Sequence, residues 1–167
     1  AITTLYLAYH TVGLEPAHMV DLDSKITFSR ARGALKMYPA IDLVRSTSSL
    51  LESGLIDPEH VRVASEVRRM IQRYDDGLHP NVEYAGLDSL FYVDEPEADA
   101  SIAVRARRLH RFLAQPLPGG DRFTGIPGMY VPLADTIKGC AEILSGKYDF
   151  VDEEAFYLIG KIQEAVT

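Results

Sequence analysis

The chain has 167 residues, 47% of them hydrophobic, and its 17 Lys and Arg stand against 24 Asp and Glu for a net charge of −7. This length and composition suffice for the core of one domain, or of one domain with part of another. The negative charge argues against nucleic acid or an anionic membrane surface as a partner and favours neutral or basic partners. Because no apolar run approaches the ~20 residues that span a bilayer, we expect no direct membrane insertion.

The single cysteine and the scattered histidines limit the chemistry that the chain can carry. Cys140 has no second cysteine with which to form a disulfide, and its apolar neighbours favour a reduced, cytoplasm-like compartment. The histidines show no zinc-ligand spacing, so we predict no metal site. Ser145-Gly146-Lys147 is not a phosphate loop, since Tyr148 stands where that motif requires Ser or Thr and Ala141 where it requires Gly.

The first elements in chain order are a strand and a helix. Residues 2–9 are rich in β-branched and aromatic types, which predicts a buried strand. The start of the chain at Ala1, inside this strand, suggests a piece of a longer protein. Residues 21–37 are predicted to form a helix capped by Asp23 or Ser24. Because Pro39 disfavours the helical region for the residue before it, Tyr38 is expected in an extended conformation just after that helix.

The clearest helical signal starts at Asp57-Pro58, where an N-cap residue is followed by proline at the first helical position. The apolar residues after it recur at helical spacing and predict one buried stripe, whereas the arginines between them are expected to face solvent. The stripe consists of Val63, Val67, Met70, Ile71 and Tyr74, and the arginines are Arg62, Arg68, Arg69 and Arg73. Gly77 and Pro80 are expected to end this helix.

An acidic segment from Asp88 to Asp99 leads into a basic helix. Acidic residues favour a helix start because of the helix dipole, and an acidic surface for a basic partner is the alternative interpretation. In the basic helix, the residues expected inside are Ile102, Ala106, Leu109 and Leu113, and those expected outside are Arg105, Arg108 and Arg111. The helix is predicted to stop at Gln115-Pro116. Pro118, Gly119 and Gly120 then let the backbone turn and approach another group closely.

Two further helices are predicted near the end of the chain. Pro132 begins the first, and Gly146 is its expected C-terminal glycine. Its apolar repeat consists of Leu133, Ile137, Cys140 and Leu144. Asp152 is predicted to cap a short second helix that carries Phe156.

Taken in order, many stretches of the chain resemble the C-terminal third of the catalytic beta subunit of F-type ATP synthase. Their combination covers nearly the whole chain and is far longer than any single motif. The matching stretches are Ile2-Thr3-Thr4; Leu22-Asp23 leading to Ser29-Arg30; Tyr38-Pro39-Ala40-Ile41-Asp42; Ser46-Thr47-Ser48; Arg105-Ala106-Arg107; Arg111-Phe112-Leu113-Ala114-Gln115-Pro116; Phe123-Thr124-Gly125; Val131-Pro132-Leu133; Thr136-Ile137-Lys138-Gly139; Ile143-Leu144-Ser145-Gly146-Lys147-Tyr148-Asp149; and Ala155-Phe156-Tyr157.

The resemblance implies a mainly α fold. Residues 21–167 would form the helical-bundle C-terminal domain, and residues 1–20 would be a short strand remnant of the α/β nucleotide-binding domain. In the family this part lines the adenine pocket, and the residues that carry over to the adenine ring are Tyr38, Leu117, Gly120 and Phe123. A flat, weakly polar base suits an aromatic face and a glycine that allows close approach.

The resemblance also limits what the chain is expected to do alone. The full-length subunit of the family binds ATP or ADP with Mg²⁺, and its phosphate loop and catalytic groups precede the part that this chain matches. We therefore expect no catalytic residue here, no cofactor on the isolated fragment and no ATP hydrolysis by it.

The same resemblance places the acidic segment where the family contacts the central stalk and transmits torque. The residues implied in that contact are Asp88, Leu90, Asp94, Glu95 and Glu97. The implied partners are the alpha subunits and the central-stalk gamma subunit. The complex would be a proton- or sodium-coupled rotary ATP synthase, and this chain would belong to its head, peripheral to the membrane on the cytoplasmic side.

The chain departs from the family pattern at three places. The acids of the stalk-contact loop are spread over extra residues with Pro96 inserted, which implies an altered coupling surface. Leu117 replaces an aromatic residue, which implies a weaker adenine clamp. Ser49 stands where the family has an arginine, and Arg45 nearby is not part of the family pattern. The family's arginine lies toward the neighbouring subunit's non-catalytic nucleotide site, so the resemblance does not carry over to this contact. Together they suggest a divergent or alternate beta subunit.

Two other interpretations stay open. The related secretion-type ATPase shares the SR and YPAID stretches, but RFLAQP, FTG and TIKG follow the synthase pattern. A non-enzymatic helical adaptor would instead use residues 88–99 to bind a basic partner. A phosphate loop upstream in the parent reading frame would argue against the adaptor.

Overall fold

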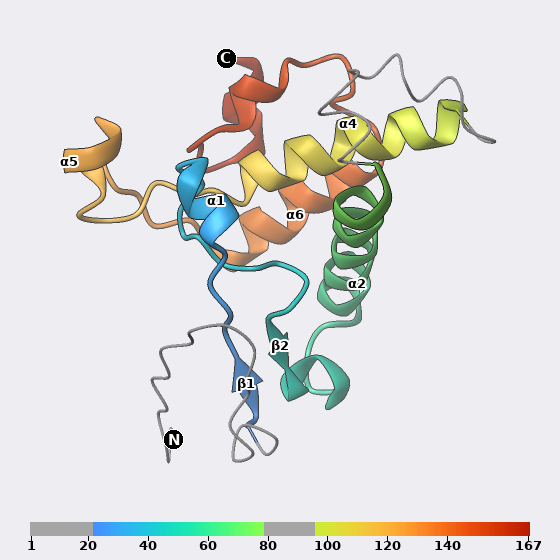
Figure 1. Ribbon diagram of the computed structural model, residues 1–167. Helices are drawn as coiled ribbons and strands as arrows, with labels where there is room; N and C mark the ends of the chain where they lie inside the picture. Colours follow the sequence, from blue (N-terminus) through green and yellow to red (C-terminus); the bar gives the residue numbers. More distant parts are fainter. Residues whose placement is uncertain (1–21, 79–95) are drawn as a thin grey trace.

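The computed structural model describes residues 22–78 and 96–167, drawn as coloured ribbon in Figure 1. Within these ranges the chain is mainly helical, with one two-stranded sheet. The strand predicted at residues 2–9 lies outside the described residues, as do Asp88, Leu90, Asp94 and Glu95. None of the helices in the described ranges is both long and apolar enough to cross a membrane.

The segment before Tyr38 is extended rather than helical over most of its length. Strand β1 (Ser24–Lys25) pairs antiparallel with β2 (Thr47–Ser48), with Ser24 opposite Ser48, and an isolated bridge joins Phe28 to Ile41. Helix α1 (Arg30–Ala34) has five residues and is capped by Ser29, whose hydroxyl accepts from the Arg32 amide at 3.2 Å. The prediction of a helix from 21 to 37 capped by Asp23 or Ser24 is therefore wrong.

Pairing with residues 40–48 is the physical reason for this difference. The backbone of Thr27 accepts from the Asp42 amide at 2.7 Å, and the Ser29 amide donates to the Ala40 carbonyl at 2.8 Å. These long-range hydrogen bonds satisfy backbone groups that a longer helix would have used, and helix propensity is too weak to outweigh them. Two apolar residues of this segment, Ile26 and Leu35, are 66% and 63% exposed and form no buried helix face.

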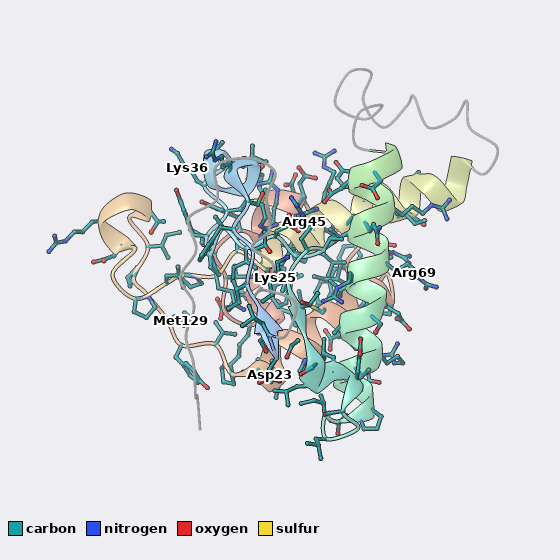
Figure 2. The ribbon with its side chains drawn as sticks, turned by 60° about the horizontal axis from the view of Figure 1, so that its bottom comes forward. Asp23, Lys25, Lys36, Arg45, Arg69 and Met129 are labelled. Atoms are coloured by element: carbon teal, nitrogen blue, oxygen red, sulfur yellow. The ribbon has the colours of Figure 1, made fainter. Side chains whose placement is uncertain are left out.

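Helix α2 (Pro58–Arg73) confirms the clearest prediction from the sequence. The Asp57 carboxylate accepts from the Glu59 amide at 2.8 Å, and Pro58 occupies the first turn. Val63, Val67 and Ile71 are buried along one face, whereas Arg69 lies on the side of α2 that faces away from the rest of the chain (Figure 2). A π-helical turn, η3 (Tyr74–Leu78), follows directly.

Helix α4 (Pro96–Phe112) is the centre of the packing. It lies against α2, against α6 (Leu133–Leu144) and against the 3₁₀ turn η5 (Glu153–Phe156), as the bundle in Figure 1 shows. The largest fully buried side chains at this junction are Ile71, Leu109, Phe112, Ile143, Phe156 and Ile162. Apolar burial of this kind is the main stabilising contribution to a small helical domain.

The remaining elements are short. A 3₁₀ turn η2 (Ser49–Glu52) links β2 to α2, and η6 (Ile162–Val166) closes the chain against α6 and η5. Helix α5 (Asp121–Thr124) stands away from the bundle at the left of Figure 1. The predicted caps near the end are confirmed, because α6 begins directly after Pro132 and the Asp152 carboxylate accepts from the Glu154 amide at 2.8 Å.

Candidate functional site

Tyr38 lies next to the end of the basic helix α4. Its carbonyl accepts a hydrogen bond from the Gln115 amide at 2.8 Å, so the YPAID and RFLAQP stretches, far apart in the sequence, are joined through their backbones. The Gln115 side chain in turn donates to the Thr136 hydroxyl at 3.1 Å, which connects this junction to α6. The Tyr38 side chain remains 41% exposed, and its hydroxyl donates to the Gly33 carbonyl at 3.4 Å.

The turn after α4 packs closely at Gly128, whereas nothing lies within 4 Å of a Cβ built at Gly119, where the sequence predicts a close approach. Pro116 is buried, its carbonyl accepts from the Met129 amide at 2.8 Å, and the Gly120 amide donates to the Leu117 carbonyl at 2.9 Å. Gly128 packs so tightly on this turn that a Cβ there would lie 2.3 Å from the Pro118 Cα. Since backbone atoms cannot move aside as a flexible side chain can, only glycine fits at this position.

Of the four residues predicted at the adenine ring, the structure describes Tyr38, Leu117 and Gly120 in full and Phe123 by its backbone alone. Tyr38 and the turn that carries Leu117 and Gly120 are neighbours through the Tyr38–Gln115 hydrogen bond, and Leu117 is 41% exposed like Tyr38. Phe123 lies in α5, but its side chain is outside the described part, as are the side chains of residues 96–99, which include Glu97. Neither of the two described cavities is lined by Tyr38, Leu117 or Gly120.

A cavity of about 510 Å³ lies between α1, η3, α4 and η5, and the sequence patterns did not point to it. Its charged and polar lining comes from four separate parts of the chain, which only the fold brings together. The lining residues with ionisable side chains are Arg32, Asp42, Asp75, Arg107, His110, Arg111 and Glu153, besides Tyr74, and apolar parts come from Leu35, Met37 and Leu43.

A chain of hydrogen bonds crosses this cavity from α1 to η3. Arg32 Nη1 lies 2.7 Å from His110 Nδ1, and His110 Nε2 lies 3.2 Å from Asp75 Oδ1. Because a guanidinium only donates, Nδ1 must accept, and the ring proton is therefore on Nε2, where it donates to Asp75. The His110 ring also lies 6.1 Å from that of Tyr74.

The other arginines of α4 are mostly paired with acids. Arg105 donates to Asp149 at 2.7 Å, and Arg107 and Arg111 share Glu153 at 2.6 and 3.1 Å. The pair with Asp149 raises the pKa of Arg105, with burial acting in the opposite direction. These side chains are half-buried, so each ion pair contributes modestly to stability.

Arg108 is the exception, and the prediction that it faces outward is wrong. It is only 8% exposed and donates to the backbone carbonyls of Val104, Asp149 and Val151. Burial lowers its pKa from the ordinary value, although Asp149 and other acids nearby oppose this. Its guanidinium is 5.9 Å from the Phe156 ring centroid. No local signal separates Arg108 from Arg105 and Arg111, since two of its three carbonyl partners, those of Asp149 and Val151, lie some forty residues away in the chain.

The arrangement combines a part-exposed aromatic and a glycine-rich turn at one end of α4 with a polar cavity beside the helix. Within residues 22–78 and 96–167, no group of three or more His, Cys, Asp or Glu side chains is placed to hold a metal ion. The comparison with protein-family models finds no model that matches the chain.

Proposed function

We propose that this chain is the C-terminal part of the catalytic beta subunit of a rotary ATP synthase, in which it forms one wall of the adenine pocket. The observation that carries the proposal is the 2.8 Å hydrogen bond from the Gln115 amide to the Tyr38 carbonyl. It joins the two stretches that the resemblance assigns to opposite parts of an adenine contact.

The chemistry of the junction suits a purine base. Tyr38 is 41% exposed, so part of its surface is open to a ligand, and Leu117, exposed to the same extent, adds apolar contact area. Gly120 has no side chain to hold a flat ring away from the turn. The phosphates and Mg²⁺ of the nucleotide would be held by another part of the full-length subunit, because this sequence contains no GxxxxGK[ST].

The second part of the proposal concerns force transmission. Asp88, Leu90, Asp94, Glu95 and Glu97 would contact the central-stalk subunit, and the alpha subunits would flank the chain in the head of the complex. The support for this part is the resemblance and the acidic composition of residues 88–99. An acidic segment suits a stalk surface that is basic.

A titration of the chain with a fluorescent adenine nucleotide tests the proposed wall of the adenine pocket, formed by Tyr38, Leu117, Gly120 and Phe123, which we call the adenine wall. We expect Tyr38→Ala to weaken binding by about tenfold or more, since loss of one aromatic that stacks on a base costs roughly 1–3 kcal/mol. Tyr130→Ala is the matched control, because Tyr130 is 83% exposed and lies outside the junction. Leu117→Phe, which restores the aromatic that the family usually has, should tighten binding.

Equal affinity of wild type and Tyr38→Ala would contradict the adenine wall. The purified chain is also expected to show no Mg-dependent ATPase activity, because the phosphate loop is not in it. A parent reading frame without GxxxxGK[ST] upstream of Ala1 would favour the adaptor over both rotary and secretion-type ATPases.

A further inference from the structure

Lys36, at the end of α1 (Figure 2), has a backbone conformation that residues with a side chain rarely adopt, with a φ of 59°. Its amide donates to the Gly33 carbonyl at 3.1 Å, and the Met37 amide donates to the Arg32 carbonyl at 2.9 Å. These two bonds form a helix end at which glycine is the usual residue in the position of Lys36. With lysine, contact between Cβ and the backbone disfavours the positive φ, so this conformation depends on support from the rest of the fold.

Tyr157 provides such support from a distant part of the chain. Its hydroxyl donates to the Lys36 carbonyl at 2.8 Å. The residues on either side of it are buried, Phe156 fully and Leu158 to 5% exposure, and the Leu158 amide donates to the Ala114 carbonyl at 3.2 Å. This packing fixes the backbone of Tyr157 against the residues that follow α4, so its hydroxyl is held in a defined place beside Lys36.

The backbone that carries Tyr38 is held at two points. The Gln115 amide donates to the carbonyl of Tyr38 itself at 2.8 Å, and Tyr157 donates to the carbonyl two residues earlier. The Tyr38 side chain is held less firmly, because it is 41% exposed and its hydroxyl reaches the Gly33 carbonyl only at 3.4 Å. Burial raises the pKa of Tyr157, Arg111 opposes this and the Tyr38 hydroxyl adds to it, which agrees with two phenol groups close together. The place of the Tyr38 ring is therefore decided mainly by its backbone.

We propose that Tyr157 is a positioning residue for the adenine wall. Through its hydrogen bond to the Lys36 carbonyl, its hydroxyl holds the segment that presents the Tyr38 ring to the base. This inference rests on the proposed function and adds to it, because the resemblance includes Tyr157 only in a matching stretch and not among the residues at the adenine ring. Since Tyr157 acts through the backbone of Lys36, loss of its hydroxyl should weaken nucleotide binding although every residue assigned to the wall is still present.

The test is a titration of the whole chain with a fluorescent adenine nucleotide, under conditions in which urea unfolding shows every variant to be folded. Tyr157→Phe keeps the ring and removes only the hydroxyl, and we expect it to weaken binding roughly threefold to tenfold, as for the loss of one hydrogen bond. Tyr148→Phe is the matched control, because it removes a hydroxyl that donates to Glu142 of α6 at 3.0 Å instead of to the segment that carries Tyr38. It should bind like wild type.

Two further measurements separate positioning from general stability. In a Lys36→Gly background the positive φ has no steric cost, so the loss caused by Tyr157→Phe should shrink. Lys36 is exposed, and its replacement by glycine removes no buried contact. In the chain without nucleotide, Tyr157→Phe should speed hydrogen exchange of the Gln115 amide, which is bonded to the Tyr38 carbonyl, whereas Tyr148→Phe should not.

A folded Tyr157→Phe that binds the nucleotide like wild type would overturn the proposal. Equal weakening by Tyr148→Phe would do the same, since it would show a general effect of destabilisation, and so would an equal loss with lysine and with glycine at position 36. A wild-type chain that does not bind the nucleotide would overturn the proposed function instead. The exchange of the Gln115 amide then decides separately whether Tyr157 holds this segment, and unchanged exchange in Tyr157→Phe would show that it does not.

Discussion

Gly139 of α6 packs directly against the ring of Phe112 at the end of α4. A Cβ at Gly139 would lie 2.3 Å from the Phe112 Cζ and 3.2 Å from the Ile162 Cβ. Phe112 is fully buried, so its ring has no free space into which to move. Because Gly139 has no side chain, α4 and α6 can approach each other this closely. Their approach also positions Gln115, three residues beyond Phe112.

We predict that Gly139→Ala destabilises the chain despite the higher helix propensity of alanine. The gain in propensity is roughly 0.5–1 kcal/mol, whereas forcing a methyl into a packed core costs about 1–3 kcal/mol. Gly33→Ala in α1 is the control, because its Cβ would meet only the Ala40 Cβ, at 3.8 Å. Urea unfolding should show a lower midpoint for the first variant and little change for the second. A Gly139→Ala protein as stable as wild type would mean that the helices are not in this contact.

Replacing Arg108 should be far more damaging than replacing Arg69. Arg108→Met leaves the carbonyls of Val104, Asp149 and Val151 without their donor, and we expect a loss of about 2–5 kcal/mol in the free energy of unfolding. Arg108→Lys should recover little of it, because an ammonium cannot reproduce the planar fork. Arg69→Met, at an exposed position, should change stability by less than about 0.5 kcal/mol. Similar effects of the two methionine variants in urea unfolding would contradict the buried position of Arg108.

Cys140 should be unreactive in the folded chain. Its side chain is 4% exposed, and burial raises the pKa of its thiol from 9.0 to about 12, so the nucleophilic thiolate is scarce at pH 8. A thiol-disulfide reagent added at pH 8 should modify the native chain very slowly and the urea-unfolded chain at the rate of a free cysteine. Fast stoichiometric modification without denaturant would show that α6 is not packed as described.

Glu142 should make the chain sensitive to acid. Its carboxylate accepts from Lys147 at 3.0 Å and from the Tyr148 hydroxyl at 3.0 Å, and these bonds, the one from Lys147 first, hold its pKa below the ordinary 4.5. The unfolded chain binds the proton more readily, so this contribution is present above about pH 4.5 and is lost as the pH falls through the lowered pKa.

The measurement is urea unfolding at pH 7 and at pH 3.5. Glu142→Gln should be less stable than wild type at pH 7, and the difference should shrink at the lower pH. Glu52→Gln, at an exposed position of η2, serves as the control and should follow wild type at both values. A difference between Glu142→Gln and wild type that does not depend on pH would exclude the ionised carboxylate as its source.

Several elements follow from local signals that act within a few residues. Asp57-Pro58 begins α2 as predicted, because an N-cap carboxylate and a proline satisfy the needs of a helix start without any distant partner. The apolar spacing of Val63, Val67 and Ile71 likewise identified the buried face. The proline and glycine residues after Gln115 predicted a tight turn, since their backbone restrictions are intrinsic.

The segment before Tyr38 and the cations of the cavity depend instead on contacts between distant parts of the chain. Thr27 and Ser29 are extended because the backbone of residues 40–42 bonds to them, and this outweighs a helix preference of a few tenths of a kcal/mol per residue. Arg32 and Arg108 resemble the more exposed arginines near them in sequence, yet both are buried in the fold, where Arg32 contacts His110 and Arg108 contacts carbonyls beyond α6. Periodicity shows which face of a helix is apolar, but the partner of a long charged side chain depends on what folds over it.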